Sequence, residues 1–261
     1  MNVSRRLALA LCLVLAAGAA TAKVVTETVT YTQGGAVLEG YLAYDDAVAG
    51  ARPGVLVVHQ WMGLSDNERM RAEMLAGMGY VAFAADIYGQ GIRPRNTDEA
   101  REQAMIYYGD ADLYRARLQA GLARLKADPR VDLARVAAIG YCFGGKGVLE
   151  LARSGADLRG VVSFHGNLDT PKPAVAGAVK AKVLVCHGAV DPYVAPEHVT
   201  GLVAEFEAAK VDYQLIMYAG AVHAFTQKGA GDDPSRGAAY QAAADRRSWQ
   251  HMQDFFGEIF D

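Results

Sequence analysis

The stretch that decides the fold reads Val136-Ala137-Ala138-Ile139, then Gly140-Tyr141-Cys142-Phe143-Gly144, then Gly145-Lys146-Gly147-Val148-Leu149-Glu150-Leu151-Ala152. The first part predicts a buried strand and the last a helix, so Cys142 stands at the tip of a sharp turn. This is the layout of a nucleophile elbow, in which the residues two before and two after the nucleophile must be small. Gly140 and Gly144 meet that need. With cysteine at the tip, the expected chemistry is acyl transfer through a thioester. The pentapeptide alone is also compatible with a buried structural thiol.

Two later strand-like runs each end in a loop that carries a further catalytic residue type. Asp191 follows the run 183–188, and His223 follows the run 212–218. In an open parallel sheet the carboxyl ends of the strands share one edge, where ligands bind. The order nucleophile, acid, histidine is that of the α/β-hydrolases. We therefore expect a triad in which His223 is the base for Cys142 and Asp191 orients the imidazole ring.

The rest of the chain alternates between strand-like and helix-like segments. An antiparallel hairpin is predicted from Val24 to Tyr31 and from Ala36 to Tyr44, around the turn Gln33-Gly34-Gly35. Further strands are predicted over 54–59, 80–85 and 160–164, and helices over 66–78, 97–108, 112–126, 197–209 and 234–260. This alternation predicts an α/β-hydrolase fold, with a mostly parallel central sheet, helices on both faces and the hairpin at the N-terminus.

The first 22 residues are typical of a secretory signal peptide. Arg5-Arg6 is a positive n-region, residues 7–17 form a short apolar core, and Ala20-Thr21-Ala22 is a small-x-small cleavage site. The alternative is an uncleaved helix. We expect cleavage after Ala22, a periplasmic or secreted protein without a lipid anchor, and a single domain over residues 23–261.

The charge and hydropathy of the chain argue against nucleic acid and membrane as binding partners. The chain of 261 residues carries 29 acidic and 26 basic side chains, a formal net charge of −3, and no basic stripe, so nucleic acid is not expected. No later apolar run is long enough to cross a membrane. We expect a small-molecule substrate and a monomer or weak homodimer.

No metal is expected, because His-Glu-x-x-His and Cys-x-x-Cys motifs are missing from the sequence. Zinc held by Cys142, Asp191 and His223 is the alternative. Cys186 lies inside an apolar strand and is interpreted as a small core residue. Export also allows a disulfide between Cys186 and Cys142, which is a second alternative.

The same segments predict which groups surround the nucleophile. The N-terminus of the helix that begins near Gly144 favours a thiolate. The backbone N–H of Phe143 should be one oxyanion donor, and the second should come from Gln60-Trp61-Met62-Gly63. His165 and His187 lie beside strand ends as candidate wall residues of the site. Four aromatic residues are candidates for a substrate pocket or, alternatively, for the core: Trp61, Tyr88, Tyr107 and Tyr108.

Taken together, these segments resemble the dienelactone hydrolase family, α/β-hydrolases with a Cys-Asp-His triad. The resemblance covers nearly all of the sequence after residue 22. It is carried by five stretches: 57–63 (VVHQWMG), 85–89 (ADIYG), 140–145 (GYCFGG), 187–191 (HGAVD) and 223–225 (HAF). It implies hydrolysis of an ester or lactone without a cofactor, with Cys142 as nucleophile, Asp191 as acid and His223 as base. It also implies that Trp61 and Phe143 supply the oxyanion donors.

Two positions depart from the family pattern. The family usually has a glutamate where Gln60 stands, and that carboxylate is thought to help switch the thiol on when substrate arrives. Glutamine cannot accept a proton, so either Cys142 is more readily ionised at rest or the enzyme is impaired. The resemblance also implies that authentic dienelactone hydrolases hold the substrate carboxylate with two arginines. Arg101 matches one, or is only a surface charge, but Gln227 and Lys228 stand where the other is expected, which argues against dienelactone itself.

The leading interpretation is an exported hydrolase that cleaves a small ester or lactone through a thioester on Cys142. A non-catalytic α/β-hydrolase-fold binding protein is the main alternative, and Gln60 is the feature that favours it. A thiol redox protein ranks last, because no resolving cysteine stands near Cys142 in the sequence.

Overall fold

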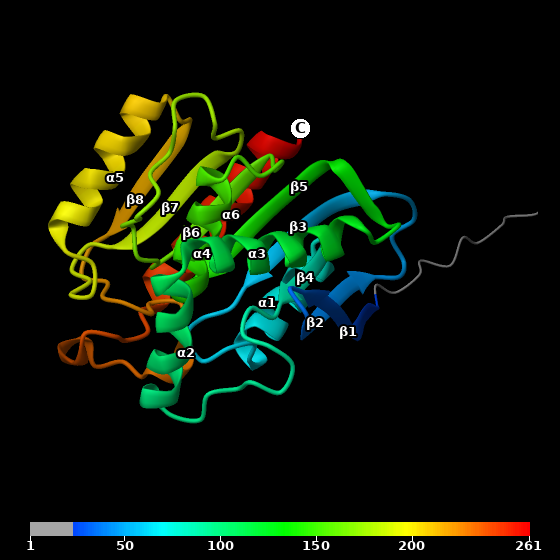
Figure 1. Ribbon diagram of the computed structural model, residues 1–261, viewed down its shortest axis with the longest axis horizontal. Helices are drawn as coiled ribbons and strands as arrows, with labels where there is room; N and C mark the ends of the chain where they lie inside the picture. Colours follow the sequence, from blue (N-terminus) through cyan, green and yellow to red (C-terminus); the bar gives the residue numbers. More distant parts are fainter. Residues whose placement is uncertain (1–22) are drawn as a thin grey trace, which may run out of the picture.

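A single eight-stranded sheet organises the computed structural model, which describes residues 23–261 (Figure 1). The predicted signal peptide, residues 1–22, lies outside the described residues. The strand order is β1-β2-β4-β3-β5-β6-β7-β8. The strands are β1 (Val24–Gln33), β2 (Ala36–Asp45), β3 (Arg52–Val58), β4 (Val81–Ala85), β5 (Val131–Tyr141), β6 (Gly160–Phe164), β7 (Lys182–Gly188) and β8 (Tyr213–Tyr218).

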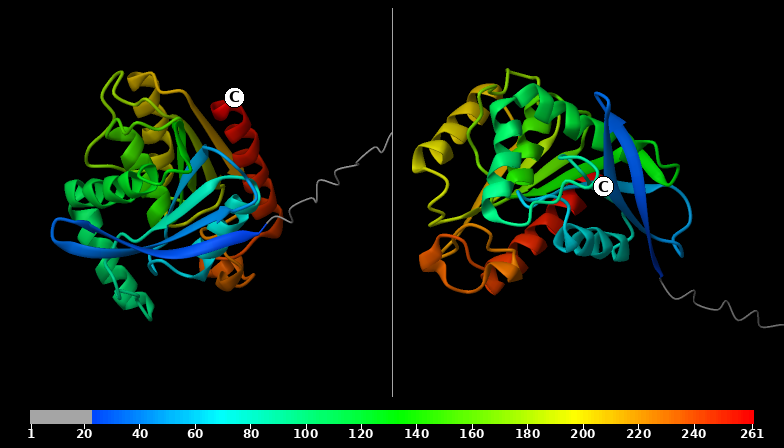
Figure 2. Two further views of the ribbon diagram at one scale, coloured as in Figure 1. Left: turned by 90° about the vertical axis from the view of Figure 1, so that its right-hand side faces the viewer. Right: turned by 60° about the horizontal axis from the view of Figure 1, so that its bottom comes forward.

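The first two strands form the predicted hairpin at one edge of the sheet (Figure 2, blue). The turn between them uses Gly34 and Gly35, both at positive φ (57° and 82°), which glycine adopts without a steric penalty. Strand β2 pairs with β4 in the antiparallel sense, and every later pairing in the sheet is parallel. The carboxyl ends of β3 to β8 therefore lie along one edge, as the sequence predicts.

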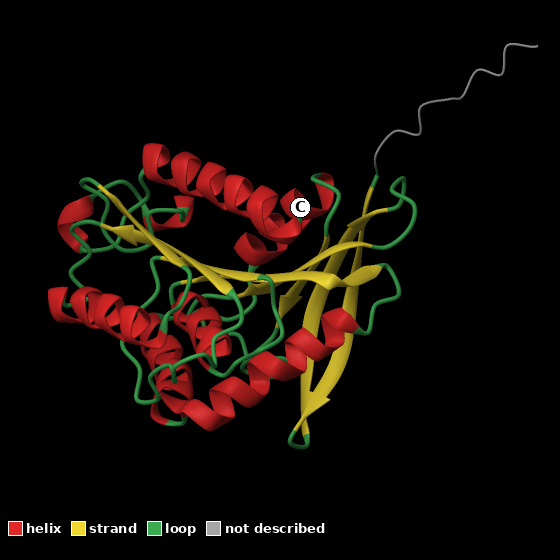
Figure 3. Ribbon diagram, turned by 90° about the horizontal axis from the view of Figure 1, so that it is seen from above, coloured by secondary structure: helices red, strands yellow, loops and turns green. Residues whose placement is uncertain are grey.

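Helices cover both faces of the sheet (Figure 3). They are α1 (Asp66–Gly77), α2 (Thr97–Gly109), α3 (Ala111–Lys126), α4 (Phe143–Arg153), α5 (Pro196–Ala209) and α6 (Ala242–Phe260). Apolar side chains of α1 and α6 pack in one core layer, and those of α3, α4 and α5 pack in the other. The central strands are buried on both faces, which explains their continuous apolar sequence. None of the helices in residues 23–261 is long and apolar enough to span a bilayer.

The N-terminal boundary of one predicted helix is wrong. The helix predicted over 234–260 begins only at Ala242, and a short 3-10 turn, Pro234–Arg236, precedes it. Between them the backbone of Gly237 to Ala239 runs beside His223: the His223 N–H donates to the Gly237 carbonyl at 3.1 Å, and the Ala239 N–H donates to the His223 carbonyl at 3.0 Å. These backbone groups hold the histidine loop, so they are not available for a helix.

Candidate active site

Cys142 joins β5 to α4 in a backbone conformation that few residues with a side chain adopt, with φ 52° and ψ −112°. Strain of this kind concentrates at functional sites. The turn is so tight that a Cβ on Gly140 would lie 2.0 Å from the Gly144 carbonyl oxygen. A Cβ on Gly144 would lie 2.2 Å from the Val58 carbonyl oxygen at the end of β3. The two glycines are therefore a steric requirement of this turn, and Cys142 becomes the N-cap of α4.

The structure brings Cys142, Asp191 and His223 together at the carboxyl edge of the sheet. His223 Nε2 lies 3.1 Å from Cys142 Sγ, and His223 Nδ1 lies 2.8 Å from Asp191 Oδ2. The Asp191 carboxylate is fully buried, and its other oxygen accepts the Tyr193 N–H at 2.9 Å. The thiol is partly exposed while its partners are largely covered. This arrangement can take a proton from the thiol and hold the imidazolium that results.

The charges in the triad support one another. Burial opposes a positive charge on His223, but the neighbouring Cys142 sulfur and the Asp191 carboxylate outweigh it and raise the pKa of His223 to about 10. An imidazolium at neutral pH favours a thiolate opposite it, as does the N-terminus of α4. The thiolate is the nucleophilic form of cysteine.

Two aromatic rings enclose the His223 imidazole. The His165 ring lies 5.2 Å away and the Tyr193 ring 5.4 Å away, each edge-on. His165 is fully buried, which lowers its pKa well below the ordinary histidine value, so it remains neutral. Its backbone has a positive φ of 40°. His187 is also buried, with its pKa lowered mainly by burial. The sequence places both histidines near the site but gives no sign of Tyr193.

Both backbone N–H groups that the sequence predicts as oxyanion donors have no acceptor within residues 23–261. They belong to Phe143, the first residue of α4, and to Trp61, in the turn after β3. The end of β3 and the loop after it lie against the start of α4, because a Cβ on Gly144 would lie 2.2 Å from the Val58 carbonyl oxygen and 2.7 Å from that of His59. Unpaired donors from these two segments are what an oxyanion hole requires.

Gln60 has a charged partner that the sequence analysis misses. Its Nε2 donates to Glu68 Oε1 at 3.1 Å, and Glu68 is fully buried. The same carboxylate accepts hydrogen bonds from Ser65 and Asn67 in a capping box at the start of α1. The spacing Ser-x-x-Glu is visible in the sequence and could have indicated this contact. A carboxylate therefore lies beside position 60, supplied by Glu68 in the first turn of α1, eight residues further along the chain.

The remaining predicted site residues are either buried in the core or at least partly exposed to solvent. Arg101 is exposed on α2, and its side chain makes no ion pair or hydrogen bond within the described chain. Tyr88 is buried, and its hydroxyl donates to the Trp61 carbonyl at 2.9 Å. Tyr107 is also a core residue, whereas Trp61 and Tyr108 are partly exposed. Only the last two remain candidates for substrate contact.

The sequence leaves two alternatives for the sulfur atoms, a disulfide between Cys142 and Cys186 and a zinc site at Cys142. Cys142 and Cys186 are both free, and Cys186 is fully buried in β7. Within residues 23–261 no group of three or more His, Cys, Asp or Glu side chains is arranged as a metal site.

Comparison with known proteins gives this geometry its context. The sequence model of the dienelactone hydrolase family matches residues 38–260. The chain belongs to the dienelactone hydrolase family. It is thus a hydrolase of the dienelactone hydrolase, or carboxymethylenebutenolidase, type with an α/β-hydrolase fold, as the sequence predicts.

Similar family members include two solved structures at 40% identity. One, m3DLH, has a TM-score of 0.87, with 91% of this chain and 99% of that chain covered. The other is a dienelactone hydrolase-like promiscuous phosphotriesterase from metagenomic libraries, with a TM-score of 0.85 and coverage of 90% and 98%. A Yersinia pestis protein named "Putative carboxymethylenebutenolidase" is 27% identical, with 84% of this chain and 83% of that protein covered.

Proposed function

We propose that this dienelactone hydrolase family member cleaves small esters or lactones with Cys142 as the nucleophile. The observation that carries the proposal is the unbroken hydrogen-bonded series from Cys142 Sγ to His223 Nε2 (3.1 Å) and from His223 Nδ1 to Asp191 Oδ2 (2.8 Å). A nucleophile, its base and the group that orients the base are thus in contact before substrate arrives.

The reaction would proceed in two halves. The thiolate attacks the carbonyl carbon, and the carbonyl electron pair moves to oxygen, where the N–H groups of Phe143 and Trp61 stabilise it. The tetrahedral species then expels the alcohol, which takes its proton from the His223 imidazolium, and a thioester remains on Cys142. Water gives a proton to His223 and attacks the thioester. The acid leaves and the thiolate returns.

The proposed substrates are small and uncharged at the acyl end. Arg101 is exposed and unpaired within the described chain, and the positions after His223 carry Gln227 and Lys228 in place of an arginine. Without a pair of guanidinium groups, a substrate carboxylate would lose bidentate binding of about 2–3 kcal/mol. Neutral esters and lactones should therefore be turned over better than dienelactone.

A small aryl ester tests the nucleophile directly. Wild type should release the phenol, Cys142→Ala should not, and mass spectrometry of quenched wild type should find the acyl group on the peptide that contains Cys142. Cys186→Ala is the matched control, because it removes the other thiol of the described chain, which is fully buried in β7. Turnover that survives in Cys142→Ala, or a free wild-type thiol that is never acylated, would contradict the proposal. The second result would favour a binding protein instead.

A phosphotriester is a second candidate substrate, favoured by the 40% identity to the promiscuous phosphotriesterase. Here the Cys142 thiolate would attack phosphorus, an aryloxide would leave, and water would later cleave the sulfur–phosphorus bond. Slow release of phenol from an aryl dialkyl phosphate that Cys142→Ala abolishes is the expected result. No release above the mutant rate would restrict the enzyme to carboxylic esters.

Export is proposed from the N-terminal sequence, together with a monomeric or weakly dimeric state. Edman sequencing of protein recovered from the periplasm or the medium should begin at Lys23, and light scattering should give a monomer at micromolar concentration. An intact Met1 on the native protein would overturn the export proposal.

A further inference from the structure

His59 is a fully buried histidine that the triad does not use. It ends the run that contains β3, and both of its ring nitrogens are engaged: Nδ1 lies 2.6 Å from the Gln60 carbonyl oxygen, and Nε2 lies 3.1 Å from the Ile87 N–H. Because a backbone N–H can only donate, Nε2 is the acceptor, and Nδ1 carries the proton that Gln60 accepts. Burial lowers the pKa of His59, which keeps this neutral form in place.

The Gln60 carbonyl belongs to the same peptide unit as the Trp61 N–H. That unit is planar and rigid, so a donor that fixes the direction of the oxygen also fixes the direction of the N–H opposite it. The Gly63 N–H donates to the same oxygen at 3.0 Å. In the following peptide unit, the Tyr88 hydroxyl donates a hydrogen bond to the Trp61 carbonyl oxygen at 2.9 Å. Both peptide units that flank Trp61 are thus tied down by buried side chains.

The same two side chains also pack against the residue that supplies the other donor. The His59 ring stacks on the Phe143 ring, with centroids 5.6 Å apart and planes 10° apart. The Tyr88 ring meets His59 at 4.7 Å and Phe143 at 5.3 Å, both edge-on. The two N–H groups without an acceptor therefore come from segments that share one rigid aromatic contact.

We propose that His59 and Tyr88 are positioning residues that aim the Trp61 N–H at the oxyanion formed on Cys142. This inference rests on the proposed function for the identity of the nucleophile. It assigns to these residues a role in stabilising the transition state but none in ionising the thiol, since neither hydrogen-bonds to Cys142, His223 or Asp191.

The test uses two probes, one for stabilisation of the oxyanion and one for the reactivity of the Cys142 thiolate. A small aldehyde forms the anion of a hemithioacetal when the thiolate attacks its carbonyl carbon and the carbonyl electron pair moves to oxygen. No group leaves, so the affinity for the aldehyde reports on the oxyanion hole without turnover. Alkylation of Cys142 by iodoacetamide needs only the thiolate. Aldehyde affinity is read from protection against alkylation, and ester kcat and KM are measured alongside.

Three variants and a control are compared. His59→Leu removes the donor, His59→Asn returns an N–H near the position of Nδ1, and Tyr88→Phe removes only the hydroxyl. Tyr107→Phe is the control, because its hydroxyl bonds to Ile87 and Tyr88 carbonyls and not to the Trp61 loop. His59→Leu and Tyr88→Phe should lower kcat and weaken aldehyde binding by about 10- to 100-fold, which is less than the roughly 100- to 1,000-fold cost of losing an oxyanion donor outright, because the Trp61 N–H is misaimed and not removed. Alkylation rate and KM should stay within about threefold, and His59→Asn should recover most of the loss.

Several outcomes would overturn the inference: unchanged aldehyde affinity in Tyr88→Phe, an equal loss in Tyr107→Phe, or alkylation that slows in step with turnover. If His59→Leu does not fold, the comparison of Tyr88→Phe with Tyr107→Phe decides. A wild type that cleaves no ester but binds aldehyde through this hole would contradict the proposed function and leave the inference standing. A wild-type thiol that alkylates freely and is never protected by aldehyde would overturn both.

Discussion

Gln60 is interpreted differently from the sequence and from the structure. In the sequence, glutamine at this position means that the family's carboxylate beside the nucleophile is missing. In the structure its amide nitrogen is bound to the buried Glu68 at 3.1 Å, so its amide oxygen is left to point elsewhere. The pair Gln60–Glu68 keeps a carboxylate close to the loop that carries Trp61. Restoring glutamate at position 60 would therefore place two carboxyl groups within hydrogen-bond distance.

Gln60→Glu should accordingly make stability fall with rising pH. Two carboxylates that share one site cannot both ionise, so the introduced carboxyl would have a pKa above its unfolded value of about 4.3. The folded state then binds more protons than the unfolded state, and stability declines as pH rises from about 4 through the raised pKa. Urea unfolding at pH 5 and pH 8 measures this as a loss of about 1–3 kcal/mol relative to wild type.

The swap Gln60→Glu with Glu68→Gln is the control, since it leaves one carboxyl and one amide in the pair. It should show the wild-type pH dependence. Equal pH dependence in the single substitution and the swap would contradict the expected repulsion.

His223 provides a second prediction at the scale of one residue. Its pKa is raised to about 10 although burial opposes the charge, and the Cys142 sulfur is the main cause of the increase. Ester hydrolysis should therefore decline above about pH 10, where the imidazole loses the proton that the leaving group needs. NMR titration of labelled histidine should place the pKa of His223 near 10 in wild type and lower in Cys142→Ala. A titration point that is the same in both proteins would contradict this coupling.

In the turn between β5 and α4, the choice of residue at position 144 is restricted by backbone atoms of another strand, β3. Gly144 is helical, and glycine is normally a poor choice inside a helix. Here the Val58 carbonyl from β3 occupies the place of its side chain. The approach of the neighbouring strand therefore excludes every larger residue.

Gly144→Ala should thus lower the free energy of unfolding by about 3 kcal/mol or more, because backbone must move to make room. Gly257→Ala is the matched control, because Gly257 lies in α6 with no atom within 4 Å of an added Cβ. That variant should gain about 0.5–1 kcal/mol from reduced chain entropy. Urea unfolding curves decide, and two glycines that tolerate alanine equally would show that the elbow can relax.

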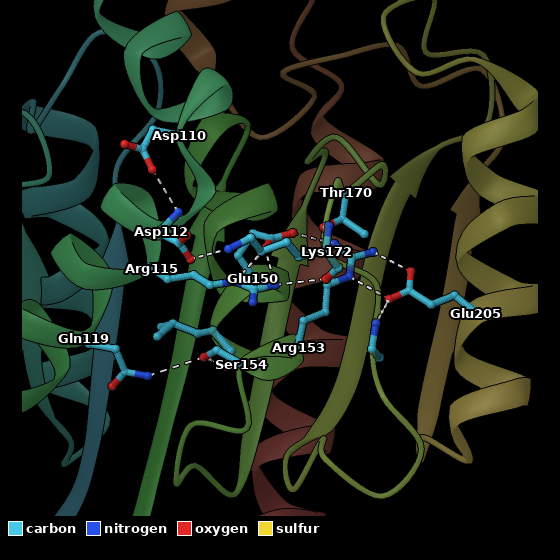
Figure 4. Close-up of polar contacts among 12 residues, drawn as sticks. Asp110, Asp112, Arg115, Gln119, Glu150, Arg153, Ser154, Thr170, Lys172 and Glu205 are labelled. Atoms are coloured by element: carbon cyan, nitrogen blue, oxygen red, sulfur yellow. Dashed lines mark hydrogen bonds and ion pairs between the residues drawn. The ribbon is translucent and has the colours of Figure 1, made fainter.

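On the scale of the whole molecule, a buried ion network joins three helices to the loop after β6 (Figure 4). Arg153, whose side chain is fully buried on α4, bonds to Glu150, to Glu205 on α5 and to the Leu168 carbonyl. Arg115 on α3 bonds to Glu150 and to the Lys172 carbonyl. The loop begins beside the elbow, where the Cys142 N–H donates to the Phe164 carbonyl at 3.0 Å. The network therefore ties this side of the site to the helical layer.

Arg153→Met should unfold more easily by about 3 kcal/mol, since the partly buried Glu205 would lose its guanidinium partner and the buried Glu150 would keep only Arg115. Arg95→Ala removes an exposed ion pair with Glu99, at 3.0 Å, and should leave stability unchanged within error. Denaturation midpoints of the two variants, together with Cys142 alkylation rates, check whether the loop by the elbow loosens as well. A stable Arg153→Met protein would mean that packing alone holds this face.

The sequence by itself determined the order of strands and helices, the two-sided fold, and the three residues most apt for a catalytic triad. It could do so because apolar periodicity, glycine at the elbow and residue type at strand ends are local properties of the chain. Tertiary structure decided what lies beside each residue: Glu68 beside Gln60, His59 behind the Trp61 peptide, and Tyr193 and His165 around His223. It also decided that residues 237–239 hold the histidine loop and do not begin a helix. These contacts join segments far apart in the chain, and their strength depends on burial and hydrogen-bond geometry, which only the folded chain defines.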